Sequence, residues 1–336
     1  MIVLKNLENS LKLSNIEDIS NQLENFIRSE VKENFRKNGV VIGLSGGLDS
    51  SVTAALSVKS LGPENVLGLI LPEKESSPKS ENLAKSLANE LGIKTKTIDM
   101  TSILDAFNIY DIRENIVKKY FDSFTEGCTY RLVVSRDAVI KGGLRIPFLE
   151  IQDNKKLIHK FRLTPSDFST LSSATSIKHR SRMSMLYFFA EQNNLAVLGS
   201  TNKSEYVQGY FVKYGDGGVD LEPIQNLYKT QVFQLAHHLK IPVDIINRKA
   251  SPDTWSLEVT DEDFFYGINY ETLDIILHAK ENDVPLANIT KLVNMSKLIN
   301  LDQLQVKNLI SYLEKRWNST LHMRKTPSSL NFKINQ

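Results

Sequence analysis

The stretch VVIGLSGGLDSSVTAAL at residues 40–56 places a loop rich in serine and glycine between an apolar run and a helical pattern. Gly46 and Gly47 allow the backbone to approach an anion closely, and the N–H groups at the start of the following helix favour negative charge. Ser50 and Ser51 are suited to cap that helix or to donate hydrogen bonds to phosphate oxygens. We therefore predict a phosphate-binding loop at residues 43–51.

The loop departs from two common nucleotide-binding patterns. It lacks the G-x-x-x-x-G-K-[ST] pattern with its lysine, and it does not fit the dinucleotide fingerprint G-x-G-x-x-G. A tight turn between strand and helix, with no chemical role, is the alternative interpretation of the same residues.

Apolar periodicity predicts the elements that must position this loop. Helical spacing over residues 16–37 predicts an amphipathic helix that ends at Asn38-Gly39. Helical patterns at 50–61 and 79–91 alternate with apolar runs that predict strands at 40–44, 65–71, 94–99 and 195–200, and a shorter fifth near 219–224. This alternation predicts an α/β fold with a doubly wound, parallel, five-stranded sheet, whose carboxyl end is the usual place for a ligand.

One region interrupts this alternation. Residues 113–170 contain YRLVVSRDAV, GGLRIPFLEIQ and KKLIHKFRL, separated by turn-forming Gly-Gly and Asp-Asn pairs. We predict a β-rich insertion over 113–170, followed by a helix at 180–194. Helices are expected over most of 229–315, and a polar tail over 318–336, within one domain of residues 1–336.

Composition excludes several classes of protein. The chain has 336 residues, of which 41% are hydrophobic, so a packed core is expected. Its 41 basic and 39 acidic residues nearly cancel, which does not suggest long-range attraction to nucleic acid or membrane. The single cysteine, Cys128, can form no disulfide within one chain, and no apolar run approaches the roughly 20 residues of a membrane span. We find no signal-peptide pattern and expect a cytoplasmic protein.

The segment SGGLDSS at residues 45–51 resembles the pyrophosphate-binding loop of the ATP pyrophosphatases, which share the adenine nucleotide alpha-hydrolase fold. In those enzymes the loop holds the β- and γ-phosphates of ATP while an acceptor attacks the α-phosphorus. The second half of the chain narrows the family. It resembles the ammonia-dependent NAD synthetases in NKSE at 202–205, GYF at 209–211, KYGDGG at 213–218 and LEPIQNLYKTQV after them. IKHRSRMSMLY at 177–187, TDEDFFYGINYETLD at 260–274 and LHMRKTP at 321–327 extend the likeness. It covers residues 16–110 and 176–327 and omits the insertion.

This resemblance implies an ATP-dependent amide ligase that adenylates a carboxylate, releases pyrophosphate and transfers ammonia, forming NAD from deamido-NAD. It implies ATP binding by Gly43, Ser45, Gly46, Gly47, Asp49, Ser50, Ser51, Thr201, Lys229 and Ser251. Mg²⁺ would be held by Asp49 and Glu205, because hard carboxylates beside phosphate oxygens suit that ion. The implied catalytic residues are Asp49, Lys213, Asp216 and Lys229, and the implied substrate-binding residues are Arg180, Lys213, Asp216, Asp220 and His322.

The same side chains also have ordinary structural interpretations. Asp49 could be a helix-terminal aspartate, Glu205 a surface glutamate and Lys229 a solvated lysine at a helix start. Gly215-Asp216-Gly217-Gly218 could be a plain turn, and His322 an exposed tail residue.

Several positions depart from the family pattern. The family's P-[ST]-A-[DG]-L stretch is ASPDT at 250–254, Ser176 replaces an asparagine, and Met323 replaces a lysine. The spacing to Gly267 is one residue longer, so that an expected glutamate falls at Phe264 or Phe265. Together with the insertion, these changes suggest a diverged carboxylate substrate as the alternative to NAD synthesis.

Two further alternatives stay open. A tRNA-modifying enzyme with the same loop would usually need a pair of cysteines and a basic surface. A catalytically silent nucleotide-binding regulator would not need Asp49, Glu205 and Lys229. As partners we expect a second copy of the chain, since the family forms homodimers, and a small carboxylate substrate. Residues 1–44 leave no room for a glutaminase before the loop, so ammonia is expected free or from a separate glutaminase subunit.

Overall fold

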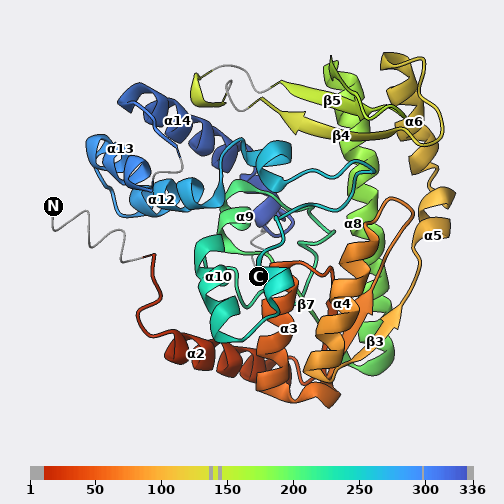
Figure 1. Cartoon of the computed structure of the whole chain (residues 1–336). Helices are drawn as coiled ribbons and strands as arrows, with labels where there is room; N and C mark the ends of the chain where they lie inside the picture. Colours follow the sequence, from red (N-terminus) through yellow and green to blue (C-terminus); the bar gives the residue numbers. More distant parts are fainter. Residues whose placement is uncertain (1–10, 136–138, 143–145, 297–298, 331–336) are drawn as a thin grey trace, which may run out of the picture.

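Four short strands form a parallel sheet at the centre of the protein (Figure 1). This computed structural model describes residues 11–135, 139–142, 146–296 and 299–330. The strands are β1 (Gly39–Gly43), β2 (Val66–Ile70), β3 (Lys94–Thr97) and β7 (Leu195–Leu198), in the spatial order β3-β2-β1-β7. Val40 of β1 lies beside Val66 on one side and Ala196 on the other. The predicted parallel α/β architecture is confirmed.

Alternate residues of β1 enter different hydrophobic cores, as the two-residue period of a strand requires. Val40 and Ile42 pack on one face, whereas Val41 packs on the other. The first face is covered by α2 (Ile16–Ser29), α3 (Leu48–Leu61), α4 (Pro78–Leu91), α10 (Lys229–His238) and α11 (Val243–Ile246). The second face is covered by α5 (Thr101–Ala106), α6 (Ile109–Tyr120) and α8 (Pro165–Asn193).

The predicted fifth strand is present only as one bridge. Within the described residues, Leu221 pairs in parallel with Leu198, and no strand forms over 219–224. Pro223 follows two residues later and has no N–H to donate to a sheet, which prevents the pairing from continuing.

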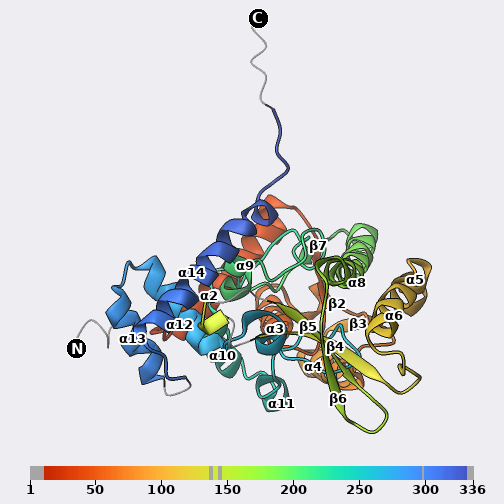
Figure 2. The same cartoon turned by 90° about the horizontal axis from the view of Figure 1, so that it is seen from above.

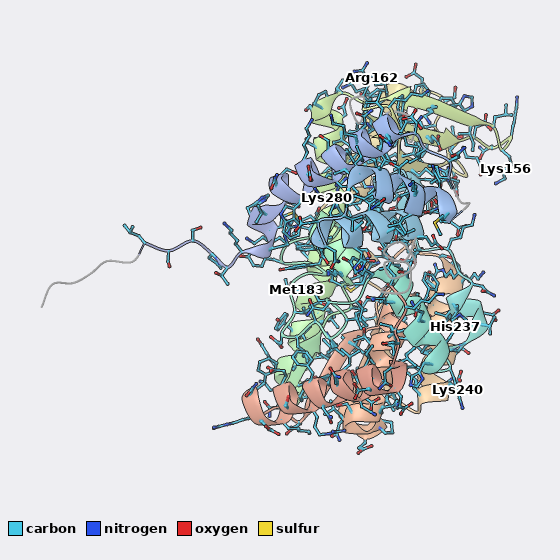
Figure 3. The ribbon with its side chains drawn as sticks, turned by 90° about the vertical axis from the view of Figure 1, so that its left-hand side faces the viewer. Lys156, Arg162, Met183, His237, Lys240 and Lys280 are labelled. Carbon is cyan, nitrogen blue, oxygen red and sulfur yellow. The ribbon has the colours of Figure 1, made fainter. Side chains whose placement is uncertain are left out.

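The insertion forms its own antiparallel sheet, but its predicted bounds were wrong at both ends. Strands β4 (Thr129–Val134), β5 (Pro147–Gln152) and β6 (Ile158–Arg162) pair in chain order. Residues 113–120 belong instead to α6, and α8 begins at Pro165, 15 residues before the predicted start of the helix at 180. The missed signal is the helix cap, since the side chain of Thr164 accepts a hydrogen bond from the Asp167 N–H. Lys156 and Arg162 mark the insertion at one end of the molecule, Lys240 lies at the other, and Met183 of α8 lies between them (Figure 3).

The remaining helices form a layer beside α9 (Lys203–Gln208), as Figure 2 shows from above. They have their own core, and they include α12 (Tyr270–Glu281), α13 (Leu286–Met295) and α14 (Gln303–Ser319). Shorter turns complete the chain: η1 (Glu30–Asn34), η2 (Pro63–Asn65), η3 (Glu262–Tyr266) and η4 (Leu321–Arg324). None of the helices in the described ranges has the length and apolar character needed to cross a bilayer.

Candidate active site

A cavity of about 550 Å³ opens where β1, β2 and β7 end. This is the carboxyl edge of the parallel sheet, where α/β proteins bind their ligands. One face of α8 lines the cavity along its length, because the lining residues recur at helical spacing. They are Phe168, Ser172, Thr175, Ser176, His179, Arg182, Met183 and Leu186.

The glycine loop follows β1 and has little room at Gly46. This residue has φ of +69°, and a Cβ built on it would lie 2.3 Å from the carbonyl oxygen of Ser80 in α4. Arg248 bridges the same two segments, because its Nη1 donates to the Gly46 oxygen at 3.2 Å and its Nη2 to Ser80 Oγ at 2.6 Å. The loop therefore requires glycine at this position for both conformation and space.

Hydroxyl groups hold the loop in shape. Ser45 Oγ accepts from the Gly47 N–H at 3.2 Å and lies 3.0 Å from Ser50 Oγ. Ser51 Oγ donates to the Gly47 oxygen at 2.7 Å, and this side chain is fully buried. Of the loop residues predicted to bind ATP, Gly43, Ser45, Gly47, Asp49 and Ser50 line the cavity, whereas Gly46 and Ser51 do not.

A buried lysine connects two carboxylates that come from separate segments. Lys229 Nζ, at the start of α10, pairs with Asp49 Oδ2 at the start of α3 and lies 3.5 Å from Glu205 Oε1 of α9. Asn202 positions both acids, because its Nδ2 donates to Asp49 Oδ1 at 3.0 Å and its side chain caps the helix that contains Glu205. Burial and the neighbouring Asp49 raise the pKa of Glu205, and Lys229 opposes that shift.

These two carboxylates suit a hard divalent cation. Both line the cavity, and two acidic groups held so close together repel each other unless a cation lies between them. Among the described residues, no group of three or more His, Cys, Asp or Glu side chains is arranged to hold a metal by itself. An ion at this place would therefore complete its shell with phosphate oxygens and water, as Mg²⁺ commonly does.

Asp261 is a cavity residue that the sequence interpretation missed. It accepts hydrogen bonds from the hydroxyl groups of Tyr210 at 2.7 Å and Tyr270 at 2.8 Å, and burial raises its pKa. The extra residue before Gly267 is accommodated in η3, where residues 262–266 form one π-helical turn. In that turn the Gly267 N–H donates to the Glu262 oxygen at 2.7 Å.

Three further cavity residues were not predicted. Ser200 lines the cavity, whereas the predicted Thr201 donates its hydroxyl to Glu222 Oε1 at 2.8 Å and does not line it. Arg182 and Arg248 add two guanidinium groups to the cavity wall; Arg248 contacts the glycine loop, whereas Arg182 donates to the Leu71 oxygen at 3.0 Å. The motif RSRM contains both Arg180 and Arg182, and their spacing on α8 could have indicated that only one faces the sheet.

The predicted substrate-binding residues separate into two groups. Asp216 lines the cavity, where its Oδ1 accepts from the Val212 N–H at 2.8 Å and lies 3.5 Å from His179 Nδ1. Asp220 braces β7 by accepting from the Val197 N–H at 2.7 Å.

The other three predicted substrate residues meet outside the cavity. Lys213 accepts from Arg180 Nε through its carbonyl oxygen at 3.4 Å and donates its Nζ to the His322 oxygen at 2.9 Å. The structure therefore brings Arg180, Lys213 and His322 together, but not at the glycine loop. Ser251 does line the cavity, and its Oγ accepts from the Asp253 N–H at 3.3 Å.

Comparison with known proteins points to one family. The family model described as NAD synthase matches residues 19–127 and 136–325, so the match breaks only at 128–135 and reaches further into the insertion than predicted. An NH(3)-dependent NAD(+) synthetase from Rhizobium meliloti is 38% identical over 256 residues, which are 76% of each chain. One from Coprothermobacter proteolyticus is 36% identical over 282 residues, which are 81% of this chain and 87% of the other.

Solved structures agree with that result. An NMN synthetase from Francisella tularensis superposes with a TM-score of 0.64 at 26% identity, covering 94% of this chain and 99% of its own. The NH3-dependent NAD synthetase from Campylobacter jejuni, in complex with nitrate, has a TM-score of 0.61 at 26% identity and covers 95% and 100%.

Proposed function

This chain belongs to the NAD synthase family, and from that premise we propose that it is a carbon–nitrogen ligase that uses ATP and ammonia to amidate deamido-NAD. A carboxylate does not condense with ammonia at neutral pH, because its oxygen is a poor leaving group. In the first step a carboxylate oxygen attacks the α-phosphorus of ATP, and the bond to the bridging oxygen breaks as pyrophosphate leaves. Ammonia then attacks the acyl carbon, AMP leaves with the former carboxylate oxygen, and one proton is released.

The observation that carries this proposal is the meeting of the glycine loop with Asp49, Glu205 and Lys229 in one cavity. Backbone N–H groups of the loop and Lys229 Nζ would bind the β- and γ-phosphates, so that the developing charge of the departing pyrophosphate is stabilised. Burial lowers the pKa of Lys229, but Asp49 and Glu205 outweigh it and raise that pKa. The lysine therefore keeps its positive charge throughout the working range of pH.

Mg²⁺ belongs to this proposal as the partner of ATP. Asp49 and Glu205 would hold it, and the ion would neutralise phosphate charge when bound. Lys229 reaches both acids, so its single positive charge offsets part of their negative charge before any divalent cation arrives.

A second carboxylate substrate is favoured by one comparison. The Francisella structure is that of an NMN synthetase, so the carboxylic-acid form of NMN is the competing substrate. The departures at Ser176, Phe264 and Phe265 all lie in the cavity wall, where they would act on substrate choice.

The deciding experiment incubates the protein with Mg-ATP, ammonium chloride and either acid, and measures the amide, AMP and pyrophosphate. We expect NAD from deamido-NAD, and a higher kcat/KM than for the mononucleotide acid. Glutamine in place of ammonia is expected to give no product, unless a separate glutaminase subunit is added. Absence of pyrophosphate with both acids would reject NAD synthesis and NMN synthesis, and would favour a different carboxylate substrate or a silent nucleotide-binding protein.

We also propose a homodimer, in which a second copy covers an apolar groove between α5 and α8. The groove has a volume of about 370 Å³, and Phe107 and Phe188 in it are 55% and 56% exposed. Exposed aromatic side chains that gather in this way mark interaction surfaces. Arg180 lines the same groove, so a partner copy would complete the surroundings of this predicted substrate residue. Sedimentation of the native protein and of Phe188→Asp tests this, with a monomeric native protein as the contrary result.

A further inference from the structure

Residues 248–258, which we name the strap, run from the glycine loop to the insertion. Residues 248–255 line the cavity, and Ser251 is among them. At the loop end, Arg248 is bonded to the Gly46 oxygen and to Ser80 Oγ, as described above. Asp253 adds a second anchor to α4, since its carboxylate accepts from the Ser77 N–H at 3.2 Å and from Ser80 Oγ at 2.7 Å.

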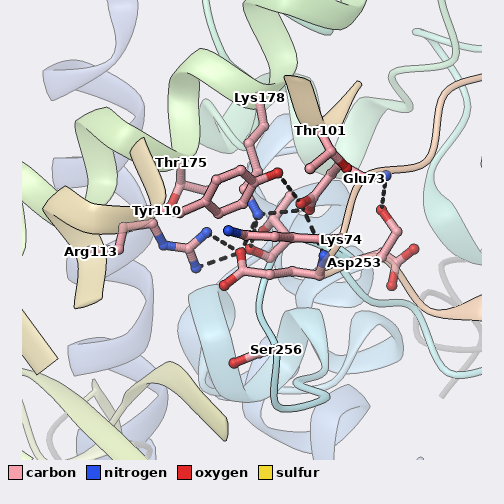
Figure 4. Close-up of polar contacts among 12 residues, drawn as sticks. Glu73, Lys74, Thr101, Tyr110, Arg113, Thr175, Lys178, Asp253 and Ser256 are labelled. Atoms are coloured by element: carbon pink, nitrogen blue, oxygen red, sulfur yellow. Dashed lines mark hydrogen bonds and ion pairs between the residues drawn. The ribbon is translucent and has the colours of Figure 1, made fainter. Parts of the chain in front are cut away.

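The middle of the strap is held by two buried cations (Figure 4). The carbonyl oxygen of Thr254 accepts from Arg113 Nη2 and from Lys178 Nζ, both at 3.1 Å. Neither cation is exposed, and both pair with Glu75. Lys178 also pairs with Glu73 at 2.7 Å, so two carboxylates balance the two positive charges. The Arg113 guanidinium also lies 4.3 Å from the ring centroid of Trp255, the next strap residue.

The far end of the strap is bound to the free edge of the insertion sheet. Tyr130 in β4 donates its N–H to Ser256 Oγ at 3.0 Å and accepts from the Leu257 N–H at 3.0 Å. Arg131 Nη1 donates to the Glu258 oxygen at 2.6 Å. Because β4 is at the edge of the sheet order β4-β5-β6, the strap covers backbone groups that would otherwise be unpaired.

All of these anchors are groups of the protein itself, and none requires a phosphate. We propose that the insertion and Arg113 act as a brace that holds the strap over the glycine loop before nucleotide binds, with Arg113 and Arg131 as positioning residues. This inference rests on the proposed role of the cavity as the ATP site. Ordering a loop residue costs backbone conformational entropy, and in this chain the cost is met during folding rather than during nucleotide binding. ATP therefore meets a site in which Ser251 is already in place, which favours its binding.

Arg131 and Lys160 provide a matched pair of variants. Both side chains pair with Glu150, Arg131 at 2.9 Å and Lys160 at 3.1 Å, but only Arg131 also reaches the strap. Arg131→Gln therefore removes one anchor, Lys160→Gln controls for the loss of the ion pair, and Arg131→Lys tests rescue. Arg113→Met removes one of the two central anchors and leaves the Lys178 contact to Thr254, with Lys118→Met on the exposed face of α6 as its control.

The first measurement is hydrogen exchange of residues 249–258 without nucleotide, and the second is steady-state kinetics with Mg-ATP. For Arg131→Gln we expect exchange roughly tenfold faster and a KM for ATP roughly three- to tenfold higher, with kcat nearly unchanged, because one charged hydrogen bond is lost. Lys160→Gln should match the native protein, and Arg131→Lys should recover much of the protection.

Unchanged exchange in Arg131→Gln would overturn the proposal, as would a fall in kcat with no change in the KM for ATP. The exchange measurement needs no turnover, so it stands even if neither acid is a substrate. If Arg113→Met does not fold, hydrogen exchange in Arg131→Gln still tests the proposal, because Arg131 is partly exposed and its replacement is less disruptive.

Discussion

Gly46 and Gly47 are adjacent in the sequence, yet the structure predicts opposite consequences for adding a methyl group to each. Gly46 has φ of +69°, and its new Cβ would lie 2.3 Å from the Ser80 oxygen, which is backbone and cannot rotate away. Gly47 has φ of −97°, and its new Cβ would meet only Ser45 Oγ at 3.2 Å, a hydroxyl that can turn.

The expected loss of unfolding free energy differs between the two alanine variants. For Gly46→Ala, the left-handed backbone costs roughly 1–2 kcal/mol and the forced displacement of loop and α4 roughly 1–3 kcal/mol more. The unfolding free energy should therefore fall by about 2–5 kcal/mol. For Gly47→Ala, which changes a helix N-cap, the expected loss is below about 1 kcal/mol.

For the affinity for Mg-ATP the order should be reversed, with the larger loss in Gly47→Ala. Gly47 lines the cavity and Gly46 does not, so the methyl group of Gly47→Ala occupies the surface where phosphate would lie. Urea unfolding without nucleotide, followed by circular dichroism, measures the stability, and titration with Mg-ATP measures the binding. The reasoning is wrong if Gly46→Ala is within about 0.5 kcal/mol of the native protein, a change typical of a neutral surface substitution. Equal losses of stability in both variants would refute it as well.

Three other outcomes are expected. Lys229→Met leaves Asp49 and Glu205 without their buried cation, so the unfolding free energy should fall by about 3–5 kcal/mol and turnover should be lost. The control Lys203→Met breaks a partly exposed ion pair and should cost under about 1 kcal/mol, as measured by thermal unfolding. We expect Mg-ATP to raise the Tm of the native protein and Asp49→Asn to abolish that rise; a retained rise would argue against Asp49 as a ligand. Burial raises the pKa of Glu222 to about 8, so the native fold holds a proton that the unfolded chain releases, and this stabilisation is lost as pH rises from about 4.5 towards 8. Glu222→Gln should therefore flatten the fall of Tm between pH 5 and 8, and an unchanged slope would contradict the shift.

Local sequence was sufficient for the glycine loop and for most elements of the sheet. The predicted strand at 40–44 and helix at 50–61 differ from β1 and α3 by one or two residues, because apolar period and turn-forming glycines act within a few residues of themselves. The same method failed at residues 219–224, where one bridge replaced a strand, and at 113–120, where α6 replaced the start of the insertion. At 219–224 the pattern was short and Pro223 interrupts it, a local signal that could have been read from the sequence. At 113–120 the pattern was short as well, and tertiary packing decided in favour of helix.

The sequence by itself determined the family, the glycine loop and the type of chemistry that Asp49, Glu205 and Lys229 could support. Only the tertiary structure decided that these three side chains meet, that Asp261 and Arg182 join them at the cavity, and that Arg180, Lys213 and His322 meet elsewhere. The physical reason is the distance along the chain over which the determining interactions act. A turn or a helix cap is specified by neighbours along the chain, whereas a cavity is specified by which faces of distant helices pack against the sheet. The strap shows this most clearly, because its partners Gly46, Arg113 and Tyr130 are far away in sequence and become its neighbours only after folding.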